Sequence, residues 1–354
     1  MKKREKSKIK LKAVLLNDTS VNNHHGCSLV VENIYKYCQE TDIEILHTVK
    51  INGRWDVDEN INIIKKANVV LINGEGTMHH SKNKAIVLAS SAIFCRQNGI
   101  FPVMINSVYE KNNDYINKAM AFFKLIFVRE SRSQSVLSDL GLKSMIVPDM
   151  TFGSNINYAF KLSNSYVLYT DSVDNELTNK LYALHKNTKG SRFITTKRRA
   201  TKNQGVQTQS WYIKKYIRNI LFWIQKRKKR KAKLNAEIEQ MYIDSTDDFI
   251  KIIANARFII TGRFHILCLA LQTRTPFVVL SSNTHKIEGL LNDIGLGNRL
   301  ITVNQLYSDD LTTFMRFDED EDKKISEYCE QSKTKIYEMF EEVKTKAIND
   351  LFVE

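Results

Sequence analysis

Arg263 and His265 lie two residues apart, where an apolar, strand-like run meets an apolar helical run. An arginine offers a permanent forked positive charge that suits a phosphate or carboxylate, and a histidine exchanges protons near neutral pH. Gly262 allows a tight turn, and the free N–H groups of the helix start attract an anion. We therefore expect Gly262 and Arg263 to bind an anionic substrate and His265 to be catalytic. The alternative is a surface arginine beside a capping histidine.

A second candidate site follows the apolar run 69–72. Glycines in such a turn let the backbone approach a ligand closely, and a carboxylate between them can bind a sugar hydroxyl or act as a base. We expect Glu75 to be catalytic and its neighbours to bind substrate, namely Gly74, Gly76, Thr77, His79 and His80. The alternative is a plain turn with a solvated acid. No third ligand is suitably spaced from the two histidines, so we expect no metal site.

Three further charged residues follow strand-like or precede helix-like segments. Arg129 ends the run 125–128 and would give a second cation for an anionic ligand. Asp149 follows the next strand at a predicted domain edge, where it is either a catalytic acid or a capping residue. Lys286 either binds the anion or faces solvent. The polar loop 18–28, before the first helix, either contacts a ligand or forms a long turn.

Short apolar runs alternate with helical patterns along most of the chain. Continuous apolar runs indicate strands that are buried on both faces, which is typical of parallel sheets. In the first half we predict strands at 9–16, 43–49, 69–72, 101–105, 125–128 and 145–147, and helices near 26–39, 58–66, 82–97, 112–122 and 131–140. The alternation restarts with strands at 166–169, 193–195, 258–261 and 277–280, and helices near 175–187, 247–254, 265–271 and 286–294.

This pattern predicts an α/β fold with two Rossmann-like, doubly wound domains, in a GT-B-like arrangement. Polar turn residues near 153–163 separate the domains, which we place at 1–157 and 158–325, with a basic amphipathic insertion at 207–240. Five consecutive acids, 318–322, precede a final helix, placed at 326–354, that packs back on the first domain. A ligand is expected in the cleft between the domains. The first domain would bind the acceptor and the second the donor.

The composition excludes a wholly disordered chain and an integral membrane protein. Of 354 residues, 43% are hydrophobic, and no apolar stretch approaches the roughly 18 to 20 residues of a spanning helix. The net charge of +14 comes from two segments: residues 1–12 carry +6 and residues 211–233 carry +10, which leaves −2 elsewhere. Such concentrated charge does not suit nucleic-acid binding. Five scattered cysteines without a C-x-x-C pair indicate a reducing, cytoplasmic environment.

The segment 211–233 combines tryptophans, an isoleucine stripe and basic residues with no acid. This is the profile of a helix that lies on an anionic membrane surface. The alternative is a helix packed on the protein's own core with a solvated basic tail.

Taken in order, three motifs resemble the polysaccharide pyruvyl transferase family over roughly residues 12–300. They are Ile72-Asn-Gly-Glu-Gly-Thr77, Val128-Arg-Glu-Ser131 through Pro148-Asp149, and Gly262-Arg-Phe-His265 through Ala270-Leu271, Pro276 and Lys286. The resemblance implies a GT-B-like transferase that moves a pyruvyl group from phosphoenolpyruvate to a sugar of a surface polysaccharide or its lipid-linked precursor, forming a ketal, with no further cofactor.

The resemblance also implies residue roles. Arg129 and Arg263 would hold the donor's phosphate and carboxylate, His265 would be the general acid, and Asp149 or Glu75 would accept the acceptor's proton. The family's early Gly-Asp turn is replaced here by residues 22–26, and its triple-glycine turn has Glu75 in the middle. Both departures lie on the expected acceptor side.

We therefore expect a cytoplasmic enzyme, peripheral at the inner face of the plasma membrane. Two alternatives remain: a GT-B-like glycosyltransferase that uses a nucleotide sugar, and a non-catalytic protein that binds glycans or membranes.

Overall fold

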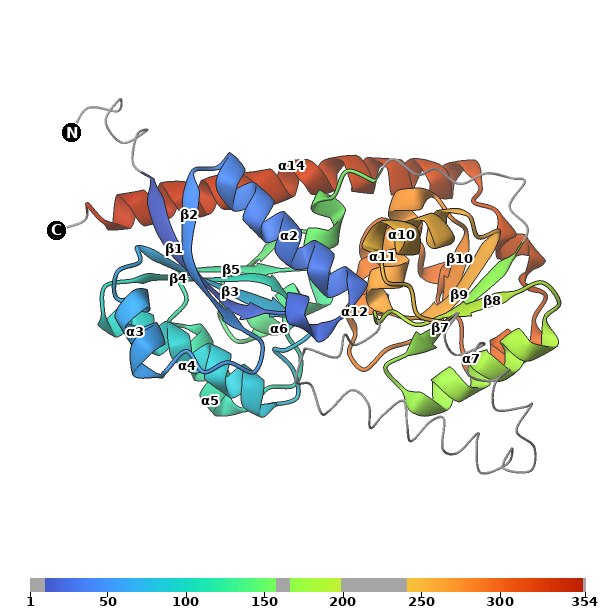
Figure 1. The fold of residues 1–354 in the computed structure, drawn as a ribbon, viewed down its shortest axis with the longest axis horizontal. Helices are drawn as coiled ribbons and strands as arrows, with labels where there is room; N and C mark the ends of the chain where they lie inside the picture. Colours follow the sequence, from blue (N-terminus) through green and yellow to red (C-terminus); the bar gives the residue numbers. More distant parts are fainter. Residues whose placement is uncertain (1–9, 157–165, 199–240, 353–354) are drawn as a thin grey trace.

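Two parallel β-sheets organise the part of the chain that the computed structural model describes, residues 10–156, 166–198 and 241–352 (Figure 1). The first sheet has the strand order β2-β1-β3-β4-β5-β6. Its strands are β1 (Leu11–Asp18), β2 (Ile43–Lys50), β3 (Val69–Glu75), β4 (Phe101–Ser107), β5 (Leu125–Val128) and β6 (Met145–Ile146). Its helices are α2 (His25–Glu40), α3 (Asp58–Ile64), α4 (Asn83–Gln97), α5 (Asp114–Met120) and α6 (Ser131–Asp139).

The second sheet has the strand order β10-β9-β7-β8. It consists of β7 (Val167–Ser172), β8 (Arg192–Ile194), β9 (Phe258–Gly262) and β10 (Phe277–Val279). Its helices are α7 (Asn175–Asn187), α10 (Thr246–Ala254), α11 (Phe264–Thr273), α12 (Lys286–Ile294) and the short α13 (Val303–Ser308). The predicted insertion 207–240 and its basic segment 211–233 lie in the stretch between described residues 198 and 241.

The strands of each sheet are parallel, and the helices that connect parallel strands cover both faces of a sheet. Every residue of β3, β4 and β9 is buried, as expected for strands between two layers of helices. In each sheet the strand order reverses once, between β1 and β3 and between β7 and β9. Ligands of open α/β sheets bind at such reversals, outside the carboxyl ends of the strands.

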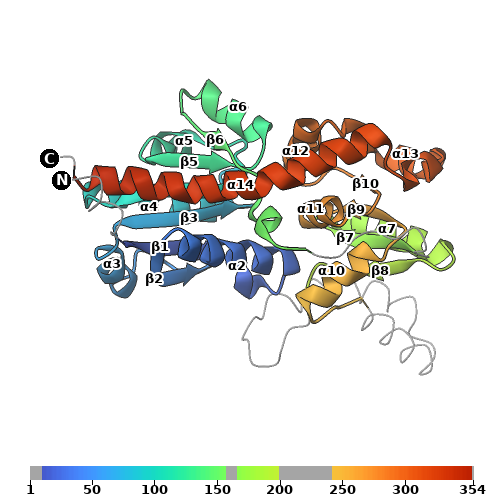
Figure 2. The ribbon, with the colours of Figure 1, turned by 90° about the horizontal axis from the view of Figure 1, so that it is seen from above.

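The last helix, α14 (Glu319–Asp350), runs along both sheets (Figures 1 and 2). It begins at Glu319, inside the acidic run, whereas we expected a start at 326. The reason is local: Asp318 and Glu321 form a capping box, and acids in the first turn favour the positive helix end. Arg274 pairs with Asp322 on the second half, and Lys124 pairs with Asp350 on the first. The helix therefore contacts both halves.

The structure confirms the predicted class, two parallel α/β units with a long terminal helix. A difference that bears on the site is that β3 and β4 continue past the expected ends, so Gly74 and Glu75 belong to a strand and not to a turn. Pairing between β3 and β4 reaches Glu75 and Ser107. Glu75 and Asn106 have positive φ angles, 34° and 54°, where a side chain is strained. Such strain is typical of positions that aim functional groups.

Candidate active site

A cavity of about 140 Å³ lies between the two sheets, outside the carboxyl ends of their strands. Six of the predicted site residues take part in its lining: Glu75, Gly76, Arg129, Arg263, His265 and Lys286. They come from four separate segments: the end of β3, the residue after β5, the junction between β9 and α11, and the start of α12. The convergence of two guanidinium groups on one imidazole, which the sequence analysis required, is thus present in the fold.

Arg129 and Asp149 form a fully buried ion pair at one wall of the site. Arg129 Nη1 lies 2.7 Å from Asp149 Oδ2, and each side chain is only 1% exposed. Arg129 also donates to the backbone carbonyl of Glu75 at 3.2 Å, and its guanidinium lies 4.6 Å from the ring centre of Phe264. Burial raises the pKa of Asp149, but the opposing effects, led by the charge of Arg129 and including a hydrogen bond from the Thr151 amide, outweigh it and lower the pKa. Asp149 is therefore ionised.

His265 lies in the first turn of α11 and faces two carboxylates. Its Nε2 atom is 3.8 Å from Glu75 Oε1 and 3.9 Å from Asp149 Oδ2. Burial lowers the pKa of His265, and the two acids only partly offset this. The imidazole is therefore neutral while the cavity holds no anion.

Gly26, at the start of α2, allows His265 to occupy this position. A Cβ atom added to Gly26 would lie 2.3 Å from His265 Cγ, far inside van der Waals contact. The backbone of α2 thus packs directly against the imidazole, and any larger residue at position 26 would displace it.

Arg263 and Lys286 make the opposite wall positive. Arg263 donates a hydrogen bond to Asp171 at the end of β7, and Asp171 also accepts from the Thr196 amide at 3.1 Å. Lys286 is 8% exposed and donates to Asn283 Oδ1 at 2.8 Å. Burial, followed by the nearby charges of Arg129 and Arg263, lowers the pKa of Lys286 to about 7. A third positive charge next to two arginines is costly unless an anion is bound.

Four ring or guanidinium nitrogens in the cavity wall are buried and have no hydrogen-bond partner among the described residues. They are His24 Nδ1, Arg129 Nε, Arg263 Nε and His265 Nε2. Buried polar groups are usually paired, and those that are not often face a ligand. The nitrogens of Arg129, Arg263 and His265 indicate that an anionic ligand completes the site.

The other predicted substrate-binding residues do not line the cavity. Gly74 packs against the Ser107 side chain, and Gly262 packs against Ser172. Thr77 accepts a hydrogen bond from Asn17. His79 contacts His80 and the carbonyl of Gly76, with ring nitrogens 2.8 and 3.0 Å from their partners. Four of the five, Gly74, Thr77, His79 and Gly262, are buried in the packing around the strand ends, whereas His80 is exposed.

Several residues of the site were not predicted individually. His24 and Cys27 from the start of α2, together with Val173, Phe264 and Ser282, complete the lining, and Asp171 holds Arg263. His24 and Cys27 lie within the loop 18–28 that was expected either to contact a ligand or to form a long turn. Two signals were available. His24 and Cys27 are three residues apart at a predicted helix start, which puts them on one face. Asp171 is an acid at the end of a predicted strand, the same signal that indicated Arg129.

Two α/β units with parallel sheets, a ligand cleft at their strand ends and a bracing terminal helix define a GT-B-like fold. A solved UDP-N-acetylglucosamine 2-epimerase shares this fold with a TM-score of 0.50 and 13% identity, over 94% of each chain. The UDP-GlcNAc 2-epimerase from Neisseria meningitidis bound to UDP-GlcNAc gives a TM-score of 0.49 and 11% identity, over 91% of this chain and 99% of that one.

The chain belongs to the polysaccharide pyruvyl transferase family, whose model matches residues 24–284. No curated protein sequence matches it. The protein is thus a transferase. The matched region begins at His24 and includes all the lining residues named above except Lys286.

We predict that Gly26→Ala displaces His265. Alanine normally favours a helix over glycine by about 1 kcal/mol, but here its methyl group would overlap the imidazole. The ring resonances of His265 in a histidine-selective NMR spectrum should shift, whereas those of His47, which bonds to Asn60, should stay in place.

Gly297→Ala is the matched control, because a methyl group at Gly297 meets no atom within 4 Å. It should leave both histidines unchanged. Unshifted His265 resonances in Gly26→Ala would contradict the packing described here.

Proposed function

We propose that the protein transfers a pyruvyl group from phosphoenolpyruvate to a sugar of a surface polysaccharide or its lipid-linked precursor, as a ketal. Family membership supports the class of reaction. The observation that carries the choice of donor is the set of three unpartnered buried nitrogens, on Arg129, Arg263 and His265, around one small cavity. Phosphoenolpyruvate is small and carries two anionic groups, a phosphate and a carboxylate, for such donors.

The two arginines would not contribute equally to donor binding. Arg129 already donates hydrogen bonds to Asp149 and to the Glu75 carbonyl. It can therefore offer the donor its Nε hydrogen and the electrostatic attraction of its positive charge. The side chain of Arg263 is 15% exposed and reaches further into the cavity wall. Lys286 adds a third cation, whose charge would be restored once an anion binds. Preorganised donors of this kind stabilise charge where it develops in the reaction.

His265 would protonate the methylene carbon of the enol phosphate. The imidazole is neutral in the empty site, but a phosphate and a carboxylate within a few ångströms would raise its pKa by opposite charge. Protonation gives an oxocarbenium ion at the adjacent carbon, and an acceptor hydroxyl attacks that carbon. The bond to the phosphate oxygen then breaks, inorganic phosphate leaves, and a second hydroxyl of the sugar closes the ketal.

Glu75 suits the role of proton acceptor better than Asp149. Asp149 is held by the charged Arg129 at 2.7 Å and by the Thr151 amide at 2.9 Å. Glu75 has only neutral donors among the described residues, the Cys27 thiol at 3.0 Å and the Asn73 amide at 3.4 Å, and its Oε1 lies 3.8 Å from the imidazole. The proposal assigns the base to Glu75, with Asp149 orienting Arg129. It requires no metal or further cofactor.

We also place the reaction in the cytoplasm, at the inner membrane face. All five cysteines are free, which suits a reducing compartment. Within the described ranges, no helix is both long enough and apolar enough to span a bilayer. The basic segment 211–233 would supply the contact with anionic lipid.

We predict that phosphoenolpyruvate raises the melting temperature of the protein. A ligand at about 100 times its Kd stabilises the folded state by about 2.7 kcal/mol, enough to measure in a thermal shift experiment. Stabilisation by a nucleoside diphosphate, with none by phosphoenolpyruvate, would instead favour the glycosyltransferase alternative.

We predict that His265→Ala lowers the transfer rate by about 10²- to 10⁴-fold, the usual contribution of a positioned acid. Phosphate release that depends on acceptor would be measured together with the mass of the glycan, which gains a pyruvyl group. The donor's Kd should change much less, because the cations remain. His47→Ala is the control. Full activity in His265→Ala would refute the assigned role.

We predict that the protein takes up protons when the donor binds above pH 7. Lys286, with a pKa of about 7, is then mostly neutral in the empty site, and a bound anion favours its charged form. Affinity should therefore fall as the pH rises from 7 to 9. Calorimetry in buffers of different ionisation enthalpy would count the protons.

Lys286→Met should reduce this uptake and leave only the proton that His265 takes up. Lys84→Met is the control, because burial also lowers the pKa of Lys84 but that residue lines a separate cavity beside Trp55. Undiminished proton uptake in Lys286→Met would assign the effect to another group.

A further inference from the structure

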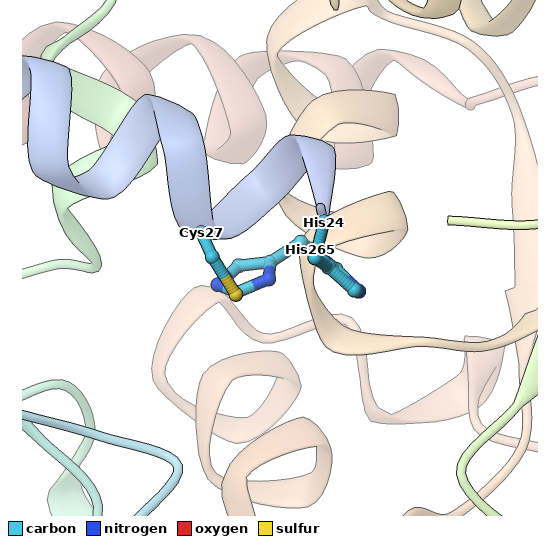
Figure 3. Close-up of side chains that lie close together, drawn as sticks. All are labelled: His24, Cys27 and His265. Atoms are coloured by element: carbon cyan, nitrogen blue, oxygen red, sulfur yellow. The ribbon is translucent and has the colours of Figure 1, made fainter. Parts of the chain in front are cut away.

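We propose that His24, Cys27 and His265 form a binding site for a zinc-like divalent cation, and that the bound cation inhibits the enzyme by holding the imidazole of His265. One ligand atom from each residue lies within 4.8 Å of the other two (Figure 3). The site itself is inferred from geometry alone. Its inhibitory effect rests on the proposed function of His265.

The three ligands come from two helix starts that meet in the cleft. His24 is the N-cap of α2 and Cys27 lies in its first turn, so their side chains share one face. His265 comes from the first turn of α11, and the missing side chain of Gly26 lets its ring approach α2. The centres of the two imidazole rings are 5.5 Å apart. Two chain segments more than two hundred residues apart thus supply one cluster.

The spacing is close to what a shared metal ion requires. A tetrahedral zinc ion with Zn–N of about 2.0–2.1 Å and Zn–S of about 2.3 Å places its ligand atoms roughly 3.3–3.6 Å from one another. The observed limit of 4.8 Å is roughly 1.2–1.5 Å wider. Metal binding would therefore require the three side chains to move closer together.

Two of the ligand residues carry buried ring nitrogens with no hydrogen-bond partner in the described part of the chain. They are His24 Nδ1 and His265 Nε2. Such nitrogens are uncommon in folded proteins. His265 Nε2 also faces the proposed anion, so His24 Nδ1 is the nitrogen that points to a further ligand independently of the spacing.

Cys27 would bind as a thiolate, and its proton has a nearby acceptor. The thiol donates to Glu75 Oε1 at 3.0 Å, and burial raises the pKa of the thiol in the metal-free protein. On binding, the S–H bond breaks, an S–metal bond forms, and the proton passes to Glu75 or to water. No oxidant or reductant is involved. Glu75 then lies beside the cation as a further oxygen ligand or counter-charge.

The charges around the cluster permit a divalent cation. Arg129 is neutralised by Asp149, and Arg263 by Asp171. Lys286 is the opposing charge, and its lowered pKa lets it lose its proton at little cost. Thiolate and imidazole ligands select Zn²⁺ over Mg²⁺ or Ca²⁺, which prefer oxygen. We therefore expect binding of Zn²⁺ and its spectroscopic substitute Co²⁺, and no binding of Mg²⁺.

A cation at this position would compete with the proposed reaction. An Nε2 atom that coordinates a metal cannot carry the proton that the donor requires. The protein would thus be reversibly silenced by free zinc and reactivated by a chelator.

The binding test uses metal-free full-length protein without substrate. Titration against a chromophoric chelator should give one Zn²⁺ per chain, and Co²⁺ should produce a near-ultraviolet thiolate charge-transfer band. Cys27→Ser and His24→Ala should each weaken binding by about tenfold or more, since even outer-shell changes cost 10- to 100-fold. Cys27→Ser should also remove the band. Cys95→Ser, a buried cysteine outside the cavity, and His47→Ala are matched controls.

Unchanged zinc affinity in both Cys27→Ser and His24→Ala, with both variants folded by circular dichroism, would overturn the site. So would the absence of any zinc binding. Cys27→Ser keeps a hydroxyl for the hydrogen bond to Glu75, so it should fold even if His24→Ala does not. None of these measurements depends on pyruvyl transfer, so the proposed function and the metal site can fail separately.

The inhibition test uses the transfer assay. Micromolar Zn²⁺ should suppress phosphate release in the unaltered protein, and EDTA should restore it. The ratio of the rates with and without zinc should be closer to one in Cys27→Ser and His24→Ala, whatever their basal rates. Loss of activity on EDTA treatment would make the metal a cofactor and overturn the inhibitory role.

Discussion

The buried pair of Arg129 and Asp149 is the interaction on which the site depends. Removing two charges from water is costly, and further contacts to the charged groups help to offset that cost. Here the Glu75 carbonyl, the Thr151 amide and the ring of Phe264 surround the pair. These contacts link β3, β5 and the loop after β6 to α11. The position of Glu75, and the electrostatic surroundings of His265, follow from this link.

Helix α2 connects the two sides of the cleft. It belongs to the first sheet, yet His25 at its start donates its amide to the Thr196 carbonyl and stacks on Phe249, with ring centres 4.1 Å apart. Its ring nitrogens also contact Ile243 O and Thr246 Oγ1. Gly26 and Cys27 follow immediately and face the imidazole and Glu75. The same turn of helix therefore joins the two halves and builds part of the cavity wall.

The elements were largely predictable because their apolar runs are local signals. The β5 and α12 bounds agree with the prediction, and most others differ by one to three residues. The ends of β3 and β4 were less predictable, because polar residues such as Asn73 and Ser107 continue the strands only through pairing with neighbours. Arg129, Arg263, His265 and Lys286 were found through the rule that ligands meet strand ends. His24, Cys27 and Asp171 were missed as site residues because their partners lie in distant segments, and the pairing of Arg129 with Asp149 is likewise a tertiary contact.

The continuous helix α14 also limits how the protein can move. Its first turn is tied to Arg274 in one half and its last turn to Lys124 in the other. Pulling the halves apart along the helix axis would break these ties, whereas a swivel about that axis would leave the helix straight. The entry of a long sugar chain is therefore expected to depend on rotation of one half relative to the other. Helix α14 keeps the distance between the two halves constant.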